Sequence, residues 1–181
     1  MLPLIVLPDL STEDRLLAQA RAGDQVAVMR IYDAYFSPVY QYIRLRLGDS
    51  MTAEDLAADV FVRFIAALRG GTAPRDSLRG WLFKVARHQI ADYYGAQAKL
   101  PQTTLDDWVS APSDEQPEVQ FLAMVSTQRA QNAVRMLAAD QQEVLVLRFG
   151  QQLSLQETAD IMGKSVSAIK SLQWRAVENL R

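Results

Sequence analysis

Five side chains near the C-terminus have the types and the spacing needed to contact a nucleic acid. They are two hydroxyls, two cations and one tryptophan: Ser167, Lys170, Ser171, Trp174 and Arg175. Their three- and four-residue spacing places them on one face of a helix that we expect to begin near Ser165 or Val166. Cations and hydroxyls contact phosphates, and long polar side chains reach base edges in the major groove. The pattern favours DNA binding over a helical hairpin with a solvated outer face.

The residues before this helix predict a second helix and a tight turn. Ser154 and Glu157 form a capping-box pattern at the start of a short amphipathic segment, and Gly163 can end that segment in a left-handed conformation. Two short helices joined through such a turn form a helix-turn-helix, whose second helix can enter the major groove of DNA.

A second group of cations lies earlier in the chain, in the segment RGGTAPRDSLRGWLFKVARHQIADYY. The candidate nucleic-acid ligands in it are Arg75, Arg79, Lys84, Arg87 and His88. Cations follow a phosphate backbone, while interleaved aromatic rings can receive an unstacked base. A core position for Trp81 and Leu82 is favoured over a base platform, whereas His88 fits a nucleotide contact and a partly buried hydrogen-bonding position equally well.

Catalysis has little support. The paired carboxylates (Glu54/Asp55, Asp106/Asp107 and Asp114/Glu115) lie at a helix start or in an acidic stretch, where the helix dipole and water suffice to explain them. The chain has no cysteine and one histidine, and it contains neither a phosphate-binding glycine loop nor a GxSxG elbow. We therefore expect no catalytic residues, no metal site and no cofactor.

The overall charge conceals local patches. The 181 residues carry a net charge of −2, yet residues 69–87 contain five cations and one acid, while residues 97–126 contain five acids and one lysine. Local patches set the field that a phosphate meets, so an acidic isoelectric point does not exclude DNA binding. The apolar run at residues 2–7 is too short to span a membrane and lacks a charged leader, so we expect a cytoplasmic protein without membrane insertion of its own.

The periodicity predicts an all-α protein of two small helical domains. Residues 11–95 form a four-helix domain, whose helices we expect to be capped in turn by Ser11 (with Asp14), Asp24, Thr52, and Asp76 or Ser77. Pro38 predicts a kink or break near Ser37.

Residues 96–117 are rich in proline, hydroxyls and acids and predict a flexible linker. Residues 118–181 form the second domain, with a helix beginning at Glu118, a further capping box at Asp140 and Glu143, and the helix-turn-helix at the end.

At this level of detail the chain resembles the extracytoplasmic-function (ECF) sigma factors of the sigma-70 family. The resemblance rests on AEDLAADVF and GWLFKVARHQIADYY in the first domain, and on LAADQQEVLVLRF, LSLQETADIMG and SVSAIKSLQWRAVENL in the second. Its motifs occur in order over nearly the whole chain.

The resemblance implies a role for each part of the chain. The AEDLAADVF helix would bind the coiled coil of the polymerase β′ clamp through Asp55 and Asp59, which lie four apart on one helical face. The loop at residues 70–77 and the following helix would open the minus-ten promoter region and capture a flipped base. The last helix would read the minus-thirty-five duplex, and the acidic linker would run through the polymerase cleft and RNA exit channel.

The resemblance also implies partners: RNA polymerase core, through its β′ clamp coiled coil and β flap, promoter DNA and an anti-sigma factor. The apolar positions expected to be covered by an anti-sigma factor are Val60, Phe61 and Ile65. Two alternatives stand beside this interpretation. One is a helix-turn-helix regulator with an N-terminal sensing or dimerisation domain, and the other is a small helical enzyme.

Overall fold

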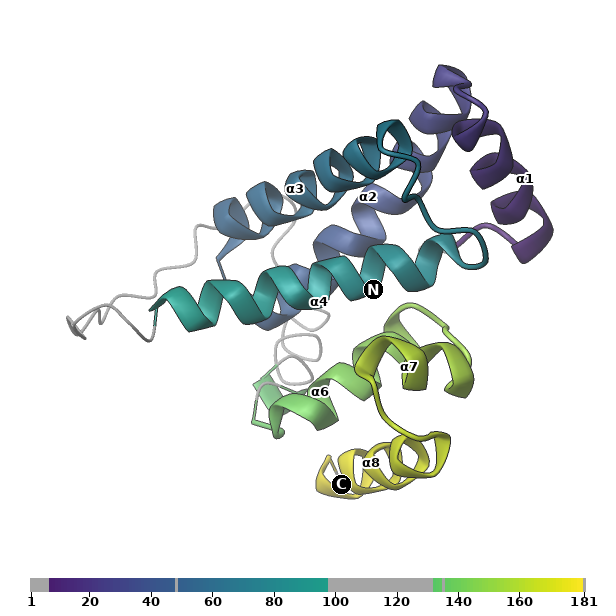
Figure 1. Cartoon of the computed structure of the whole chain (residues 1–181). Helices are drawn as coiled ribbons and strands as arrows, with labels where there is room; N and C mark the ends of the chain where they lie inside the picture. Colours follow the sequence, from purple (N-terminus) through teal and green to yellow (C-terminus); the bar gives the residue numbers. More distant parts are fainter. Residues whose placement is uncertain (1–6, 48, 98–131, 135, 181) are drawn as a thin grey trace, which may run out of the picture.

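The computed structural model describes residues 7–47, 49–97, 132–134 and 136–180, and every regular element in those ranges is helical. The helices, shown in Figure 1, are α1 (Leu10–Arg21), α2 (Gln25–Leu47), α3 (Ser50–Arg69), α4 (Leu78–Gln97), α6 (Ala139–Leu145), the π-helical turn η1 (Val146–Gly150), α7 (Leu155–Met162) and α8 (Val166–Asn179). The expected all-α class is confirmed. The predicted linker from residue 98 onward and the helix expected at Glu118 lie outside the described residues.

The N-terminal domain is built from three long helices, α2, α3 and α4, with α1 across one end (Figure 1). Apolar residues at helical spacing turn inward from each helix, and the largest fully enclosed side chains include Tyr35, Tyr42, Phe64 and Phe83. Helix α4 ends at Gln97, whose side-chain amide donates a hydrogen bond to the Tyr93 hydroxyl at 2.6 Å.

The break expected at Pro38 does not occur, because α2 runs from Gln25 to Leu47 without interruption. Proline removes one backbone hydrogen bond of the helix. Pro38 is buried together with its neighbours Tyr35 and Val39, so packing on both sides of the lost bond stabilises the helical path. Burial of Pro38 in the core here outweighs the tendency of proline to break a helix.

Aspartates rather than hydroxyl residues cap the first and third helices, which corrects the expectation of Ser11 and Thr52. Asp9 accepts a hydrogen bond from the Thr12 amide at 2.9 Å, and Asp49 accepts one from the Thr52 amide at 2.8 Å. The Ser11 hydroxyl donates to Asp9 at 2.6 Å and, with the Thr12 groups, lowers the pKa of Asp9 to about 2. A carboxylate also complements the positive end of the helix dipole, so it outcompetes a neighbouring hydroxyl for the cap.

The other predicted caps have mixed outcomes. Asp24 accepts from the Val26 amide and Ser77 from the Gly80 amide, as expected. The capping box expected at Asp140 is wrong, since α6 follows Ala138 with no side-chain cap. Glu143, the expected second member of that box, is instead buried, with 1 % of its surface exposed.

The helix-turn-helix is confirmed. Both hydrogen bonds of the Ser154–Glu157 capping box are present at the start of α7, and Gly163 ends that helix at φ 64°. A side chain at that φ would be strained, so glycine suits the turn. Ser165 then caps α8 by accepting from the Ala168 amide. Ile169 and Ala176, both at 0 % exposure, pack α8 inward.

A buried carboxylate holds α1 in place. Glu13 accepts from the Tyr35 hydroxyl at 2.5 Å, from Arg79 Nε at 2.6 Å and from the Arg79 amide at 3.2 Å. Arg79 also donates to the Pro8 carbonyl at 2.5 Å. Burial, and then Glu13, raises the pKa of Tyr35, so its hydroxyl keeps the donated proton. This network joins α1 to α2 and to the start of α4.

We predict that Glu13→Ala destabilises the N-terminal domain, because it leaves the Arg79 guanidinium buried without its anion. The free energy of unfolding, measured by urea denaturation, should fall by about 3–5 kcal/mol. Glu54→Ala removes an exposed carboxylate from α3 and should change that value by no more than about 0.5 kcal/mol. Equal effects of the two substitutions would contradict the structural role of the network.

Candidate nucleic-acid interface

All five candidate ligands of the last helix lie on the exposed face of α8. Lys170, Ser171, Trp174 and Arg175 line a shallow, open depression, and the Trp174 ring is 67 % exposed. A large aromatic ring is rarely left in water without a use, and an indole beside two cations suits contact with sugar, phosphate and base edges. The opposite face of α8 is buried, so this face is presented outward on a fixed support.

Backbone contacts order part of this face. Arg175 Nε donates to the Ser171 carbonyl at 3.3 Å, and the Ser171 hydroxyl donates to the Ser167 carbonyl at 3.1 Å. These bonds direct the arginine back along the helix, which reduces the side-chain entropy lost when the guanidinium binds a ligand. The arrangement suits a helix that docks into a groove.

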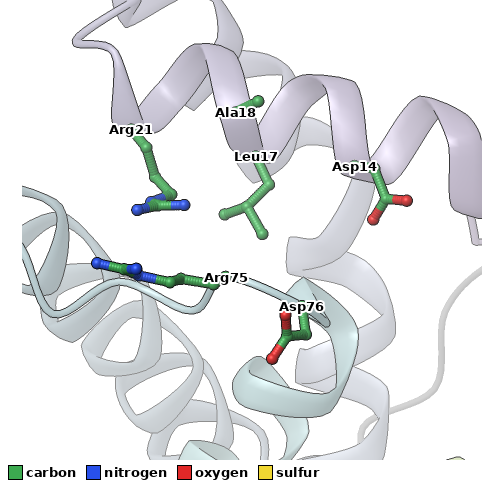
Figure 2. A pocket seen from close by; sticks show the side chains of 6 residues that line it. All are labelled: Asp14, Leu17, Ala18, Arg21, Arg75 and Asp76. Carbon is green, nitrogen blue, oxygen red and sulfur yellow. The ribbon is translucent and has the colours of Figure 1, made fainter.

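A pocket of about 310 Å³ separates α1 from the loop that precedes α4. Figure 2 shows the side chains that line it: Asp14, Leu17, Ala18, Arg21, Arg75 and Asp76. The two guanidinium groups lie toward one end and the two carboxylates toward the other, with Leu17 between them (Figure 2). The volume is at the small end of ligand-binding pockets. Its walls offer hydrogen-bond donors, acceptors and an apolar surface together.

The other four candidates in this half of the chain are not gathered in the pocket. Lys84 and His88 lie exposed, four residues apart on α4. Arg79, with 8 % of its surface exposed, is held in the Glu13 network, while Arg87 donates through Nε to Glu143 at 3.0 Å. The structure therefore brings Arg75 to the pocket, leaves Lys84 and His88 on the surface, and places both remaining arginines on buried carboxylates.

The interleaved aromatics divide between core and surface. Phe83 and Leu82 are fully buried, and Trp81 packs against Phe64 with ring centroids 5.8 Å apart. Tyr94 is 46 % exposed and donates to the Arg46 carbonyl at 2.6 Å. The core position preferred for Trp81 and Leu82 agrees with the structure.

The candidate protein-binding residues lie on α3. Asp55 and Asp59 are both exposed, one helical turn apart. The apolar positions expected to meet a covering protein need correction, because Val60 and Phe61 are 0 % and 4 % exposed and belong to the core. The exposed large apolar side chains on this helix are Met51, at 76 %, Val62, at 62 %, and Ile65, at 38 %, and only the last two lie near the expected positions.

Sequence reasoning missed two groups of residues. Asp14 and Arg21 line the pocket, but α1 is far from the loop in sequence and no local pattern links them. Glu143 matched a capping pattern, and nothing in the sequence indicates that its partners come from the other half of the chain.

In the part of the chain that the structure describes, no helix is long and apolar enough to cross a membrane. No group of three or more histidine, aspartate or glutamate side chains there could hold a metal ion.

Comparison with family models matches both halves of the chain. Residues 31–100 match Sigma-70 region 2, and residues 133–181 match Sigma-70, region 4. Among solved structures, CnrH in complex with the cytosolic domain of CnrY has a TM-score of 0.70 at 23 % identity, covering 93 % of this chain and 94 % of that one. The sigma factor RpoE, in complex with the anti-sigma factor NepR from Bartonella quintana, has a TM-score of 0.67 at 20 % identity, covering 84 % and 92 %. These two structures share the fold.

Curated relatives give the closer likeness in sequence. The ECF RNA polymerase sigma factor SigD of Mycobacterium tuberculosis is 32 % identical over 93 % of this chain and 82 % of its own length. The ECF RNA polymerase sigma factor BldN of Streptomyces coelicolor is 39 % identical over 91 % of this chain, which spans 63 % of that relative's length. Identity at this level over both halves, with both region models in order, shows that the chain belongs to the ECF sigma factors of the sigma-70 family.

Proposed function

We propose that this sigma factor binds RNA polymerase core and directs it to promoters, with α8 on the minus-thirty-five element and the pocket beside α4 on the minus-ten element. The observation that carries the proposal is the outward face of α8. It presents two cations, two hydroxyls and an exposed tryptophan on the second helix of a helix-turn-helix. Membership of the sigma-70 family supports promoter DNA as the ligand of this helix. Because RNA polymerase acts in the cytoplasm, we propose the same location for this protein.

The pocket between α1 and the loop at residues 70–77 suits a flipped base. Its carboxylates can accept hydrogen bonds from base amino groups, while Arg21 and Arg75 can donate to base oxygens or to the flanking phosphates. Unstacking a base costs a few kcal/mol, which these contacts must offset. Lys84 and His88, exposed on the adjoining helix, would continue the contact along the strand.

Asp55 and Asp59 are the residues we assign to the polymerase β′ clamp coiled coil. Exposed carboxylates one turn apart can face a basic helix pair without a change in α3. We further propose an anti-sigma factor as a regulator, since solved structures of similar fold hold an anti-sigma factor. Val62 and Ile65, which are exposed on the same helix, are apolar residues that such a partner could cover.

Reversing the two acidic charges should weaken binding to polymerase core. Asp55→Arg combined with Asp59→Arg is expected to raise the dissociation constant at least tenfold, because like charges would then meet at the contact. Fluorescence anisotropy of labelled protein titrated with core polymerase measures this. Asp92→Arg combined with Asp160→Arg makes the same change in charge on exposed acids of α4 and α7 and should have little effect. A comparable loss in both double variants would remove the assignment.

Truncating the α8 face should weaken duplex binding alone. Trp174→Ala and Arg175→Ala are each expected to cost about 1–3 kcal/mol in binding to a minus-thirty-five duplex. Both side chains are exposed, so thermal stability and affinity for core polymerase should not change. The duplex affinity is measured by anisotropy at a fixed salt concentration. Retention of full duplex affinity in both variants would show that α8 is not the recognition helix.

Loss of the pocket arginine should impair promoter opening. Arg75→Ala is expected to slow opening of the minus-ten region at least fivefold, because a donor to the flipped base or its phosphate is lost. The rate is followed by 2-aminopurine fluorescence at the minus-ten position in holoenzyme complexes. Arg69→Ala removes an exposed arginine at the end of α3, outside the pocket, and serves as the control. Equal opening rates in the two variants would rule out the pocket.

A further inference from the structure

The two domains lie against each other through a defined polar contact. Helix α7 packs on α4, and η1 packs on α2. Figure 1 shows α6 and α7 beside α4, with α8 on the far side of α7. The apolar residues of the two halves belong to one continuous buried cluster, which includes Ile43 and Leu82 from the first domain and Leu147 and Leu153 from the second.

Glu143 of α6 is the charged centre of this contact. One of its oxygens accepts from the Tyr42 hydroxyl at 2.6 Å and from Arg87 Nε at 3.0 Å. The other lies 3.4 Å from Arg46 Nη1. All three partners belong to the N-terminal domain, on α2 and α4, and Glu143 and Tyr42 are both almost completely enclosed, at 1 % and 0 % exposure.

The arrangement is matched to a carboxylate. Burial, followed by the charge of Glu143, raises the pKa of Tyr42 well above its usual value, so the phenol stays protonated and acts as the donor. A buried anion is tolerated only where cations and donors replace its lost water, and here two arginines and one hydroxyl do so. A second, weaker contact joins the domains where Glu157 of α7 lies 3.8 Å from Arg79.

We propose that Tyr42, Arg46 and Arg87 form a carboxylate receptor through which the N-terminal domain docks the C-terminal domain of the same chain. We further infer that the docked form cannot engage both elements of one promoter. The docking is independent of the proposed function, whereas its consequence for promoter binding rests on that function.

The consequence follows from distance. Helices in contact lie about 8–10 Å apart, so α7, which packs on both α4 and α8, keeps those two helices within about 20 Å of each other. Elements centred near minus-ten and minus-thirty-five are about 25 base pairs, or roughly 85 Å, apart on straight duplex DNA. A docked form that holds α4 and α8 within about 20 Å therefore cannot place them on two elements this far apart.

Docking also removes one candidate DNA ligand, because Arg87 is bound to Glu143. When only a fraction of the molecules is in the form that can bind, the apparent affinity for the target is reduced by that fraction. Undocking is therefore a step that polymerase core or a promoter must drive.

The docking is tested by the distance between the domains in the full chain. Because the sequence contains no cysteine, Ala91→Cys in α4 and Val177→Cys in α8 give two unique positions for fluorophores. Single-molecule energy transfer should show a dominant high-transfer population in the otherwise unchanged protein. Glu143→Gln and, separately, Tyr42→Phe should each increase the low-transfer population at least tenfold, with helical content unchanged by circular dichroism.

Asp160→Asn removes an exposed carboxylate of α7 and should leave the populations unchanged. The Tyr42→Phe variant keeps its ring packed against Phe83, at 5.5 Å between centroids, so its effect cannot come from lost packing. A dominant low-transfer population in the parent protein would overturn the docking. Populations unchanged in both the Glu143 and Tyr42 variants would overturn the carboxylate receptor.

Affinity measurements with the same variant separate the docking from its effect on polymerase and promoter binding. Glu143→Gln should raise the apparent affinity for polymerase core at least threefold and leave the affinity for an isolated minus-thirty-five duplex unchanged, because the α8 face is exposed in the docked form. Domain opening without this gain would confirm the receptor and overturn its inhibitory role. Failure of the parent protein and the variant alike to bind core would instead contradict the proposed function.

Discussion

A carboxylate taken out of water must be surrounded by cations and donors, and this constraint fixes the arrangement of the helices at two places. Glu13 and Glu143 are each 1 % exposed, and each is bound by an arginine and a tyrosine that come from other helices. An apolar contact tolerates small shifts, whereas a buried ion pair with hydrogen bonds does not. The first carboxylate aligns α1 with α4, and the second aligns the two domains.

The two candidate DNA surfaces depend on these supports in different ways. The pocket has one wall from α1 and one from the loop before α4, so its shape requires the Glu13 network to hold the walls together. The α8 face needs only its own domain, because Ile169 and Ala176 bury its inner side. One surface is therefore assembled from distant segments, while the other is built from a single helix.

This difference explains what the sequence could predict. The helix-turn-helix was read from local signals, the Ser154–Glu157 capping box and Gly163, and both appear in the structure with the expected geometry. The residues of the α8 face follow directly from helical periodicity. The sequence predicts only part of the pocket. Arg75 lies in a recognisable loop, whereas no local pattern indicates that residues of α1 line the same pocket.

The errors share one cause, which is that local patterns do not reveal distant partners. Asp140 and Glu143 have the spacing of a capping box, yet α6 has no side-chain cap and Glu143 accepts a hydrogen bond from Tyr42 of the other domain. Arg79 belongs to a group of cations near the loop, but it forms a salt bridge with Glu13, which is far away in the sequence. Pro38 lies within a helix that tertiary packing keeps continuous.

Transcription from a defined start site tests the central claim most directly. Purified protein is added to sigma-free RNA polymerase core on linear genomic fragments, and run-off transcripts are mapped to their 5′ ends. The structure predicts discrete start sites that depend on this protein, at a fixed distance from a shared pair of upstream elements. Transcripts with random 5′ ends, or the same pattern with and without the protein, would contradict the account.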